Sequence, residues 1–384
     1  MTRVAAALST APSAAEAGSE AARAARGRLG GEEPDLALVF LSPDHADAAE
    51  DAVAAVTEEL DAGRLVGCVA QGVVAGRREI EDGPGAAVWA ASLPGARVET
   101  FHATAFETED AYEIRGIPDG LADAALVTLL VDPFTFPTAS FLARLNAERP
   151  GLPVVGGLAV AGGEPGTQAL LHEREVHAEG AVGALLTGVR VRPLVSQGCA
   201  PLGRDSVVTR AEGNVVHELA GMPALERLKE EIAALPPRAQ VLAARGLLAG
   251  LVIDENRPAY GRGDYLMRGV LGADEQSGAI AIGEPVRVGQ TLRFHVRDAE
   301  SADRDLREAL AGVGGEQVAG ALLFTCNGRG TNMFARPDHD ARLVTETFGS
   351  DAVAGVFCGG EIGPVGGRTF LHGFTATMAV FLAD

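Results

Sequence analysis

Two cysteines, each ending an apolar segment and beginning a glycine-rich one, are the residues best suited to chemistry in this sequence. Cys326 opens the run Cys-Asn-Gly-Arg, and Cys358 opens Cys-Gly-Gly-Glu. Glycines let backbone N–H groups face a bound molecule, while an arginine and a carboxylate supply opposite charges. We therefore predict a small-molecule site formed by Cys326, Asn327, Gly328, Arg329, Cys358, Gly359, Gly360 and Glu361.

The charges in this site suggest a zwitterionic ligand. Arg329 could bind a carboxylate through two parallel hydrogen bonds, and Glu361 could receive an ammonium group. The alternative is a tight turn with a solvated arginine, because Asn-Gly is common in turns. Two matching strand ends within one segment favour the pocket.

Two further ligand-binding candidates lie earlier in the chain. Arg268 follows strand-like residues in Gly-Asp-Tyr-Leu-Met-Arg-Gly. A partly buried arginine needs an anionic partner, which is either the ligand or a structural carboxylate. Cys199 lies in a loop rich in glycine and proline. A catalytic thiol needs a nearby base, and nothing in the sequence brings His217 or His295 to Cys199, so we predict no catalytic residue.

Metal and nucleotide sites are not predicted. If residues 172–177 form a strand, Glu173, Glu175 and His177 share one face. The segment lacks the His-x-x-x-His spacing of a helical zinc site, and a charged hairpin explains it better. The glycine-rich run Gly156–Gly166 has no Gly-Lys-Ser/Thr ending, which disfavours nucleotide binding.

The composition narrows the function further. The chain has 384 residues, is 47% hydrophobic and carries a net charge of −20, which argues against nucleic acid as a partner. Its four cysteines are widely spaced, so neither a disulfide framework nor structural zinc is expected. No apolar run approaches the ~20 residues that span a bilayer, and the N-terminus does not read as a signal peptide. We expect a soluble, cytoplasmic protein.

A recurring order of elements must position these residues. Apolar strands at Leu36–Leu41 and Ala125–Val131 are each followed by a helical pattern, a second strand with an internal glycine, a loop and a third strand. The segment from Ala321 repeats this order, with the glycine at Gly67, Gly156 or Gly355. Such self-similarity predicts an α/β fold of mixed sheets built from repeated strand–helix–strand–strand units, with α+β as the alternative.

The same segments resemble the FIST family. In the N-terminal half the resemblance rests on LALVF and GCVAQGVV. In the C-terminal half it rests on VSQGCAPLG, GDYLMRGVLG, FHVRDAESADRDL, FTCNGRG and VFCGGEIGPVGG. The likeness begins near Pro34, so we expect an N-terminal helical segment at 1–33, a FIST N-type α/β domain at 34–190 and a FIST C-type domain at 191–384.

The resemblance implies a bacterial sensory protein that binds a small, amino-acid-like or similar metabolite in signal transduction and is not an enzyme. Two alternatives stay open. The first is a haem-based sensor of nitric oxide or another gas. The second is a cysteine-dependent enzyme that uses Cys326 or Cys358 together with Glu361. We expect no cofactor, with haem as the alternative, and His339 and His372 lie nearest the glycine-rich loops. No kinase or receptor segment is evident, so the expected output is a separate signalling protein.

Overall fold

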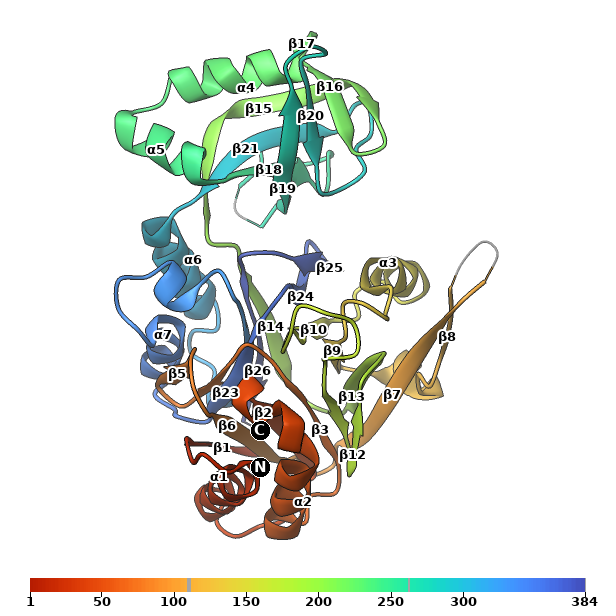
Figure 1. Cartoon of the computed structure of the whole chain (residues 1–384), viewed down its shortest axis with the longest axis vertical. Coiled ribbons are helices and arrows are strands. Elements are labelled where there is room, and N and C mark those ends of the chain that lie inside the picture. Colours follow the sequence, from red (N-terminus) through yellow and green to blue (C-terminus); the bar gives the residue numbers. More distant parts are fainter. Residues whose placement is uncertain (109–111, 262, 384) are drawn as a thin grey trace. The chain divides into compact units, whose positions relative to one another are not determined.

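The computed structural model describes residues 1–108, 112–261 and 263–383, which form two compact units (Figure 1). Unit 1 comprises Met1–Val195 and Arg307–Asp384, and unit 2 comprises Ser196–Leu306. The predicted domains divide the chain once, between residues 190 and 191. In the structure, residues 307–384 belong to the same compact unit as the N-terminal half. Among the described residues, no helix is long and apolar enough to cross a membrane.

Unit 1 contains three mixed sheets. The first has the order β1-β6-β2-β3-β11-β12, with β1 at Arg3–Ser9, β2 at Leu36–Leu41, β3 at Leu65–Val69, β6 at Ala86–Ser92, β11 at Leu170–His172 and β12 at Glu175–His177. The second has the order β25-β24-β10-β9-β13-β7-β8, with β7 at Arg97–Glu107, β8 at Tyr112–Arg115, β9 at Leu126–Val131, β10 at Val154–Leu158, β13 at Ala181–Thr187, β24 at Glu361–Val365 and β25 at Arg368–His372. The third has the order β14-β26-β22-β23-β4-β5, with β4 at Gly72–Ala75, β5 at Arg78–Ile80, β14 at Val191–Ser196, β22 at Val318–Cys326, β23 at Val353–Cys358 and β26 at Ala376–Leu382.

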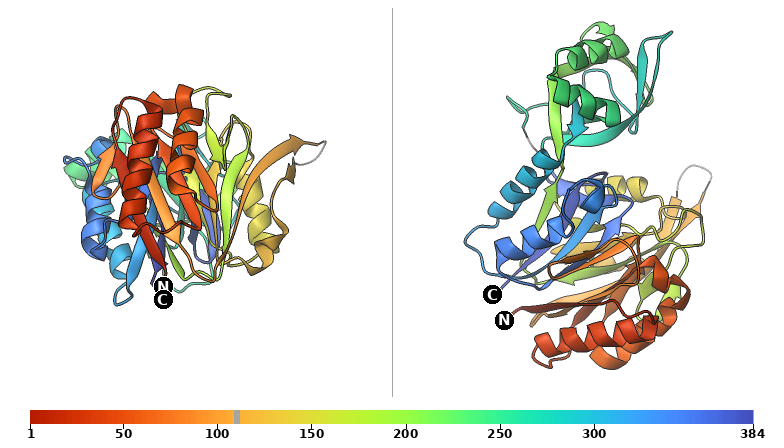
Figure 2. Two further views of the ribbon diagram at one scale, coloured as in Figure 1. Left: turned by 90° about the horizontal axis from the view of Figure 1, so that it is seen from below. Right: turned by 60° about the vertical axis from the view of Figure 1, so that its left-hand side comes forward.

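Helices connect and cover these sheets. Helix α1 (Ala14–Arg28) packs against α2 (Ala49–Leu60), and Figure 2 shows the two side by side over one face of the first sheet. Helix α2 connects β2 to β3. In the same way, α3 (Thr138–Glu148) connects β9 to β10, and α7 (His339–Phe348) connects β22 to β23. Helix α6 (Ala299–Ala311) crosses from unit 2 into unit 1 along the chain, and short 3₁₀ turns lie at Pro43–Ala48, Asp119–Asp123 and Gly330–Asn332.

The predicted repeat is present three times and its hairpins are exchanged. Each copy has a parallel pair, β2 with β3, β9 with β10 or β22 with β23. The hairpin that follows the pair leaves its own sheet. Thus β4–β5 pairs with β23, β11–β12 with β3, and β24–β25 with β10. Each sheet is therefore completed by another copy, which links the C-terminal segment to the N-terminal half.

The internal glycine of each copy is required by this pairing. Gly67, Gly156 and Gly355 lie opposite Val39, Leu129 and Leu323 on the neighbouring parallel strand. A Cβ at these glycines would come within 1.9, 1.8 and 1.6 Å of the partner's carbonyl oxygen. Because no larger side chain fits, the regular spacing seen in the sequence reflects backbone contact between strands.

The centre of unit 1 is an apolar core shared by the three sheets. Trp89 and Phe381 lie 4.9 Å apart between ring centroids, and Phe40 and Phe324 lie 6.3 Å apart. Both pairs join the first and third sheets, and all four side chains are fully buried. Truncating such residues typically costs about 3–5 kcal/mol, so this core fixes the sheets against each other.

Unit 2 is built on one antiparallel sheet with the order β15-β21-β18-β19-β20-β16-β17. Its strands are β15 (Cys199–Glu212), β16 (Val215–Leu219), β17 (Met222–Pro223), β18 (Leu247–Val252), β19 (Tyr265–Asp274), β20 (Ala279–Ile282) and β21 (Thr291–Arg297). Because β15 also pairs with β16, the sheet closes on itself. Helices α4 (Ala224–Ala233) and α5 (Pro237–Arg245) complete the unit.

The structure confirms the mixed-sheet prediction and changes one local expectation. The segment 1–33 contains the predicted helix, but it also contains β1, which pairs antiparallel with β6 from Arg3↔Ser92 to Ser9↔Ala86. The sequence RVAAALS was not predicted as a strand because alanine has low strand propensity. The neighbouring strand supplies the hydrogen bonds that stabilise this conformation.

Candidate functional site

The structure brings the two predicted strand ends together in unit 1. Cys326 and Cys358 are direct register partners on β22 and β23, and the Asn327 N–H donates to the Cys358 carbonyl at 2.9 Å. Glu361 begins the next strand, and its carboxyl group lies close enough to both thiols that its ionised form raises the pKa of each. We call Cys326, Arg329, Asp340, Cys358 and Glu361 the strand-end cluster.

Arg329 is bound by a carboxylate of the protein itself. Its Nε and Nη2 donate to the two carboxylate oxygens of Asp340 at 2.7 and 2.8 Å. Arg329 is 0% exposed, and Thr325 adds a hydroxyl hydrogen bond to Asp340 at 2.8 Å. Asp340 therefore holds the Nε and Nη2 edge of Arg329, while Nη1 has no hydrogen-bond partner among the described residues, and the expected role of Arg329 in binding a ligand carboxylate stays a prediction.

Glu361 is a buried acid with a protein partner. Its Oε2 accepts hydrogen bonds from the N–H and hydroxyl of Thr375 at 2.9 and 2.8 Å. Its Oε1 makes no hydrogen bond of normal geometry within the described part of the chain, although the Cys326 thiol lies near the carboxyl group. Burial outweighs these contacts and raises the pKa of Glu361 to about 8. At neutral pH this raised pKa favours the protonated carboxyl, which disfavours the expected contact with a ligand ammonium.

The glycines of the cluster are packed rather than open. The Gly359 N–H donates to Leu158 O at 3.1 Å, and Gly360 O accepts from the Leu158 N–H at 2.8 Å. A Cβ at Gly359 would lie 2.6 Å from Val160, and one at Gly328 would lie 2.9 Å from Phe374. The loop expected to face a ligand instead lets β10 and neighbouring side chains approach closely.

The thiols of unit 1 are in environments that oppose reactivity. Burial raises the pKa of Cys326 to about 12 and raises those of Cys358 and Cys68 further. A thiolate is the nucleophilic form of cysteine, so these groups remain protonated at neutral pH.

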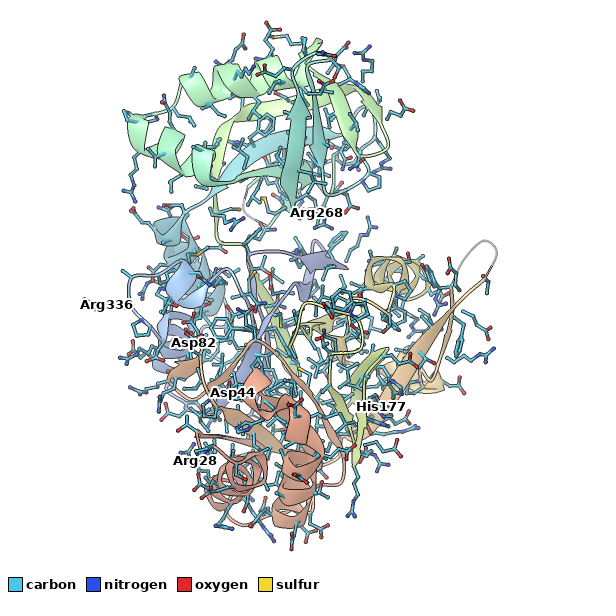
Figure 3. The ribbon with its side chains drawn as sticks, in the orientation of Figure 1. Arg28, Asp44, Asp82, His177, Arg268 and Arg336 are labelled. Carbon is cyan, nitrogen blue, oxygen red and sulfur yellow. The ribbon has the colours of Figure 1, made fainter. Side chains whose placement is uncertain are left out.

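Arg268 in unit 2 binds a structural carboxylate, which was one of the two expected partners. Its Nε lies 2.7 Å from Glu284 Oε2, and its Nη1 donates to Met267 O at 3.0 Å (Figure 3). This ion pair accounts for a partly buried arginine on β19 without a ligand.

Cys199, by contrast, lines a cavity of about 240 Å³ that lies entirely in unit 2. The other lining residues include acids, bases and aromatic rings: Gln197, Pro201, Tyr260, Gly261, Tyr265, Met267, Arg293, His295, Ser301, Arg304 and Asp305. Ligand sites combine such apolar surface with a few convergent polar groups. We regard this cavity as the candidate functional site.

Local strand geometry explains how the cavity brings Cys199 and His295 together. On the paired strands β15 and β21, Cys199 lies opposite Arg297 and Pro201 lies opposite His295. Cys199 and Pro201 are two residues apart, so their side chains share one face of the sheet. Nothing in the sequence alone places His295 near Cys199, because only the strand register brings them together.

His295 is a neutral, oriented imidazole. Its Nδ1 lies 3.0 Å from Arg293 O, and a carbonyl can only accept, so Nδ1 carries the proton and Nε2 has the lone pair. Burial lowers the pKa of His295 to about 4, and Tyr265 packs edge-on at 5.2 Å. The Tyr265 hydroxyl donates to Asp205 at 2.6 Å, which with burial raises the pKa of Tyr265 to about 12.

Buried hydrogen bonds fix the other side of the cavity. Asp305 Oδ2 accepts from the Ser196 hydroxyl at 2.7 Å and from the Gln197 N–H at 2.6 Å. The Gln197 amide in turn donates to Tyr265 O at 2.7 Å. These contacts join α6 to β19, so the lining is held in place before any ligand binds.

Cys199 is the only lining residue that was predicted from the sequence, and those that were missed include Gln197, Tyr265, His295 and Asp305. Each lies in one of the segments that carry the family resemblance. Their types gave no signal, because they come from three separate segments that only the folded sheet brings together.

The predicted absence of a metal site stays a prediction, although no group of three or more histidine, cysteine or acidic side chains among the described residues could hold a metal ion. The segment 172–177 forms the expected hairpin, β11 with β12. At its end lies His177, which is labelled in Figure 3. Its ring stacks on that of His102 with ring centroids 3.8 Å apart.

The two histidines considered for haem differ. His372 is 3% exposed and its Nε2 lies 2.9 Å from Gly363 O, so that nitrogen donates to a carbonyl and does not fit a haem ligand. His339 stacks on Phe334 at 3.5 Å, and its Nδ1 lies 2.9 Å from Asp340 Oδ1. A carboxylate on Nδ1 suits an axial ligand, so haem remains an alternative through His339, which is the less buried of the two.

Comparison with known proteins gives two family matches. The FIST N domain matches residues 35–222, and the FIST C domain matches residues 224–364. The match boundary lies within unit 2, so neither domain coincides with one compact unit. The predicted boundaries at 34–190 and 191–384 stay a prediction.

The chain is also similar to mycobacterial proteins along its full length. It is 46% identical over 383 residues to uncharacterized protein Rv0628c of Mycobacterium tuberculosis H37Rv, covering 99% of this chain and 100% of that protein. It is 45% identical over 386 residues to uncharacterized protein Mb0898c of Mycobacterium bovis, covering 100% and 99%. A solved cyanuric acid hydrolase from A. caulinodans aligns with 99% of both chains at a TM-score of 0.29 and 10% identity, which supports no inference.

Proposed function

Because this chain belongs to the FIST family, whose domains are associated with small-ligand sensing in signal transduction, we propose that it is a non-enzymatic sensory protein that binds a small, amino-acid-like metabolite. The cavity in unit 2 is the observation that carries this proposal. The protein would act in the cytoplasm and pass its signal to a separate protein.

The charges and rings of the cavity suit a zwitterion. Arg293 and Arg304 line it with two guanidinium groups, and the Nε of Arg293 is buried without a hydrogen-bond partner in the described residues. These groups would receive the ligand carboxylate. Tyr260 and Tyr265 present aromatic surface that stabilises an ammonium group. The volume of about 240 Å³ suits a ligand of amino-acid size.

The lining supports binding more than turnover. Cys199 and His295 would be the natural nucleophile and base, but an imidazole with a pKa of about 4 is a weak acceptor for a thiol proton. We therefore place Cys199 against the ligand as a packing group.

Calorimetry with the standard amino acids tests this proposal. At least one amino acid should bind, and Arg304→Gln should weaken its binding about tenfold or more, because a charge-assisted hydrogen bond is lost. Arg238→Gln is the control, since Arg238 belongs to the same unit but is 76% exposed and pairs with Glu300 on the surface. Equal effects of both variants would contradict the cavity as the site.

Thiol labelling gives a second readout. Ligand should slow alkylation of Cys199, because both occupy the cavity, and should leave the buried thiols of unit 1 unchanged. Mass spectrometry of the recovered ligand distinguishes binding from catalysis, since a chemically altered ligand would contradict a non-enzymatic role. Titration with haem tests the remaining alternative, and a Soret band lost in His339→Ala would favour it.

A further inference from the structure

Unit 1 contains a second cleft, which the proposed function does not use. It has a volume of about 390 Å³ and is lined by Arg307, Arg336, Pro337, His339, Arg342, Leu343 and Glu346. All of these residues belong to unit 1, so the cleft is independent of the cavity in unit 2. We call it the α7 cleft.

The α7 cleft has the opposite charge to the rest of the protein. The chain carries 52 acidic and 32 basic residues, yet the cleft is lined by three arginines, one histidine and one glutamate. Four of the lining residues, at positions 339, 342, 343 and 346, share one face of α7 because their spacing follows the helical period. A concentration of arginine in an acidic protein indicates a site for an anion.

The arginines of the cleft differ in how far they are already paired within the protein, and so in how readily they can bind an anion. Arg336 makes no ion pair or hydrogen bond with any described residue, and Figure 3 places it on the side of unit 1 that carries α7. Arg342 pairs with Asp338 at 3.2 Å, but its side chain is 59% exposed, so water weakens this contact. Both can reorient towards a bound anion.

The wall of the cleft is rigid. The His339 ring stacks on Phe334 at an interplanar angle of 9°, and its Nδ1 contacts Asp340. Asp340 is in turn held by Arg329 and Thr325 within the strand-end cluster. The cluster thus fixes the first turn of α7, whose N-terminal dipole adds positive potential beside the arginines.

We propose that the α7 cleft binds the phosphate group of a small phosphorylated metabolite. Guanidinium groups match phosphate oxygens with paired, charge-assisted hydrogen bonds, and a cleft of this size has room for a small phosphate ester. The ligand would give the sensor a second chemical input on the unit that does not contain the amino-acid cavity.

Calorimetry with two probes tests this inference, using the full chain at constant ionic strength in chloride. The probes are inorganic phosphate and glycerol 3-phosphate. We expect the ester to bind, and the double variant Arg336→Gln/Arg342→Gln to weaken binding about tenfold to a hundredfold. The variant Arg336→Lys/Arg342→Lys should fall in between, because an ammonium group keeps the charge without the planar fork.

Arg144→Gln is the matched control. Arg144 is a half-exposed arginine on α3 that pairs with an acid four residues away, as Arg342 does on α7. No binding of either probe, or an equal loss in Arg144→Gln, would overturn the inference. Phosphate binding as tightly as the ester would support the anion site and identify inorganic phosphate itself as the ligand.

Discussion

The strand-end cluster of unit 1 and the cavity of unit 2 contain similar side chains, but those of the cluster are bound by other residues of the protein and those of the cavity face an open space. Both contain cysteine, arginine and a buried carboxylate. In the cluster, Arg329 and Glu361 are 0% exposed and are bound by Asp340 and Thr375. In the cavity, Cys199, Arg304 and Tyr260 line an accessible space. Residue type alone does not mark a binding site, because a partner elsewhere in the fold can satisfy the same group.

The largest effect should come from breaking the buried ion pair. Asp340→Ala leaves the Arg329 charge buried without its partner, so we expect a loss of about 3–5 kcal/mol in the unfolding free energy of unit 1. Trp89, the chain's single tryptophan, lies in the core of unit 1 and reports its unfolding in urea. Asp351→Asn is the control, because its pair with Arg77 is exposed and should cost less than about 1 kcal/mol.

Glu361 should make the stability of unit 1 fall as pH rises. Its folded pKa of about 8 exceeds its ordinary value of 4.5, so the unfolded state loses the proton first as pH rises. The resulting loss of stability develops between about pH 4.5 and 8 and is about 5 kcal/mol. Glu361→Gln lacks this contribution, so its stability relative to the wild type should increase over that range. A constant difference from pH 4.5 to 8 would show that Glu361 is ionised in the folded protein.

His295 should give unit 2 the opposite dependence. Its pKa is lowered from 6.5 to about 4 in the folded state, so the unfolded state takes up the proton first as pH falls. Stability is then lost between about pH 6.5 and 4, by about 3 kcal/mol. Hydrogen exchange of strands β18 and β21 should show this loss in the wild type and not in His295→Gln. Faster exchange at higher pH, after correction for intrinsic rates, would contradict it.

Arg268 should give the smallest effect. Its pair with Glu284 is only partly buried, so Arg268→Gln should cost about 1 kcal/mol or less and leave amino-acid binding in the cavity unchanged. A clear loss of binding in this variant, measured by the same calorimetry, would place Arg268 among the ligand-binding residues.

The repeat and the strand ends were predictable because they depend on local pattern. The glycines at 67, 156 and 355 are required by contact between adjacent strands, and that requirement is visible as nearly constant spacing from the start of each first strand. The exchange of hairpins between copies was not predictable, since the hydrogen bonds of β4, β11 and β24 could be satisfied by any available strand edge.

The sequence by itself determined the family, the mixed sheets and the matching strand ends at Cys326 and Cys358. Tertiary structure alone decided that Asp340 binds Arg329 and that Cys199 and His295 share a cavity. The physical reason is that periodicity and glycine spacing act between neighbours in the chain or in one sheet. Whether a charged group is paired within the protein or able to bind a ligand depends on burial and on partners from distant segments. No local sequence pattern records these partners.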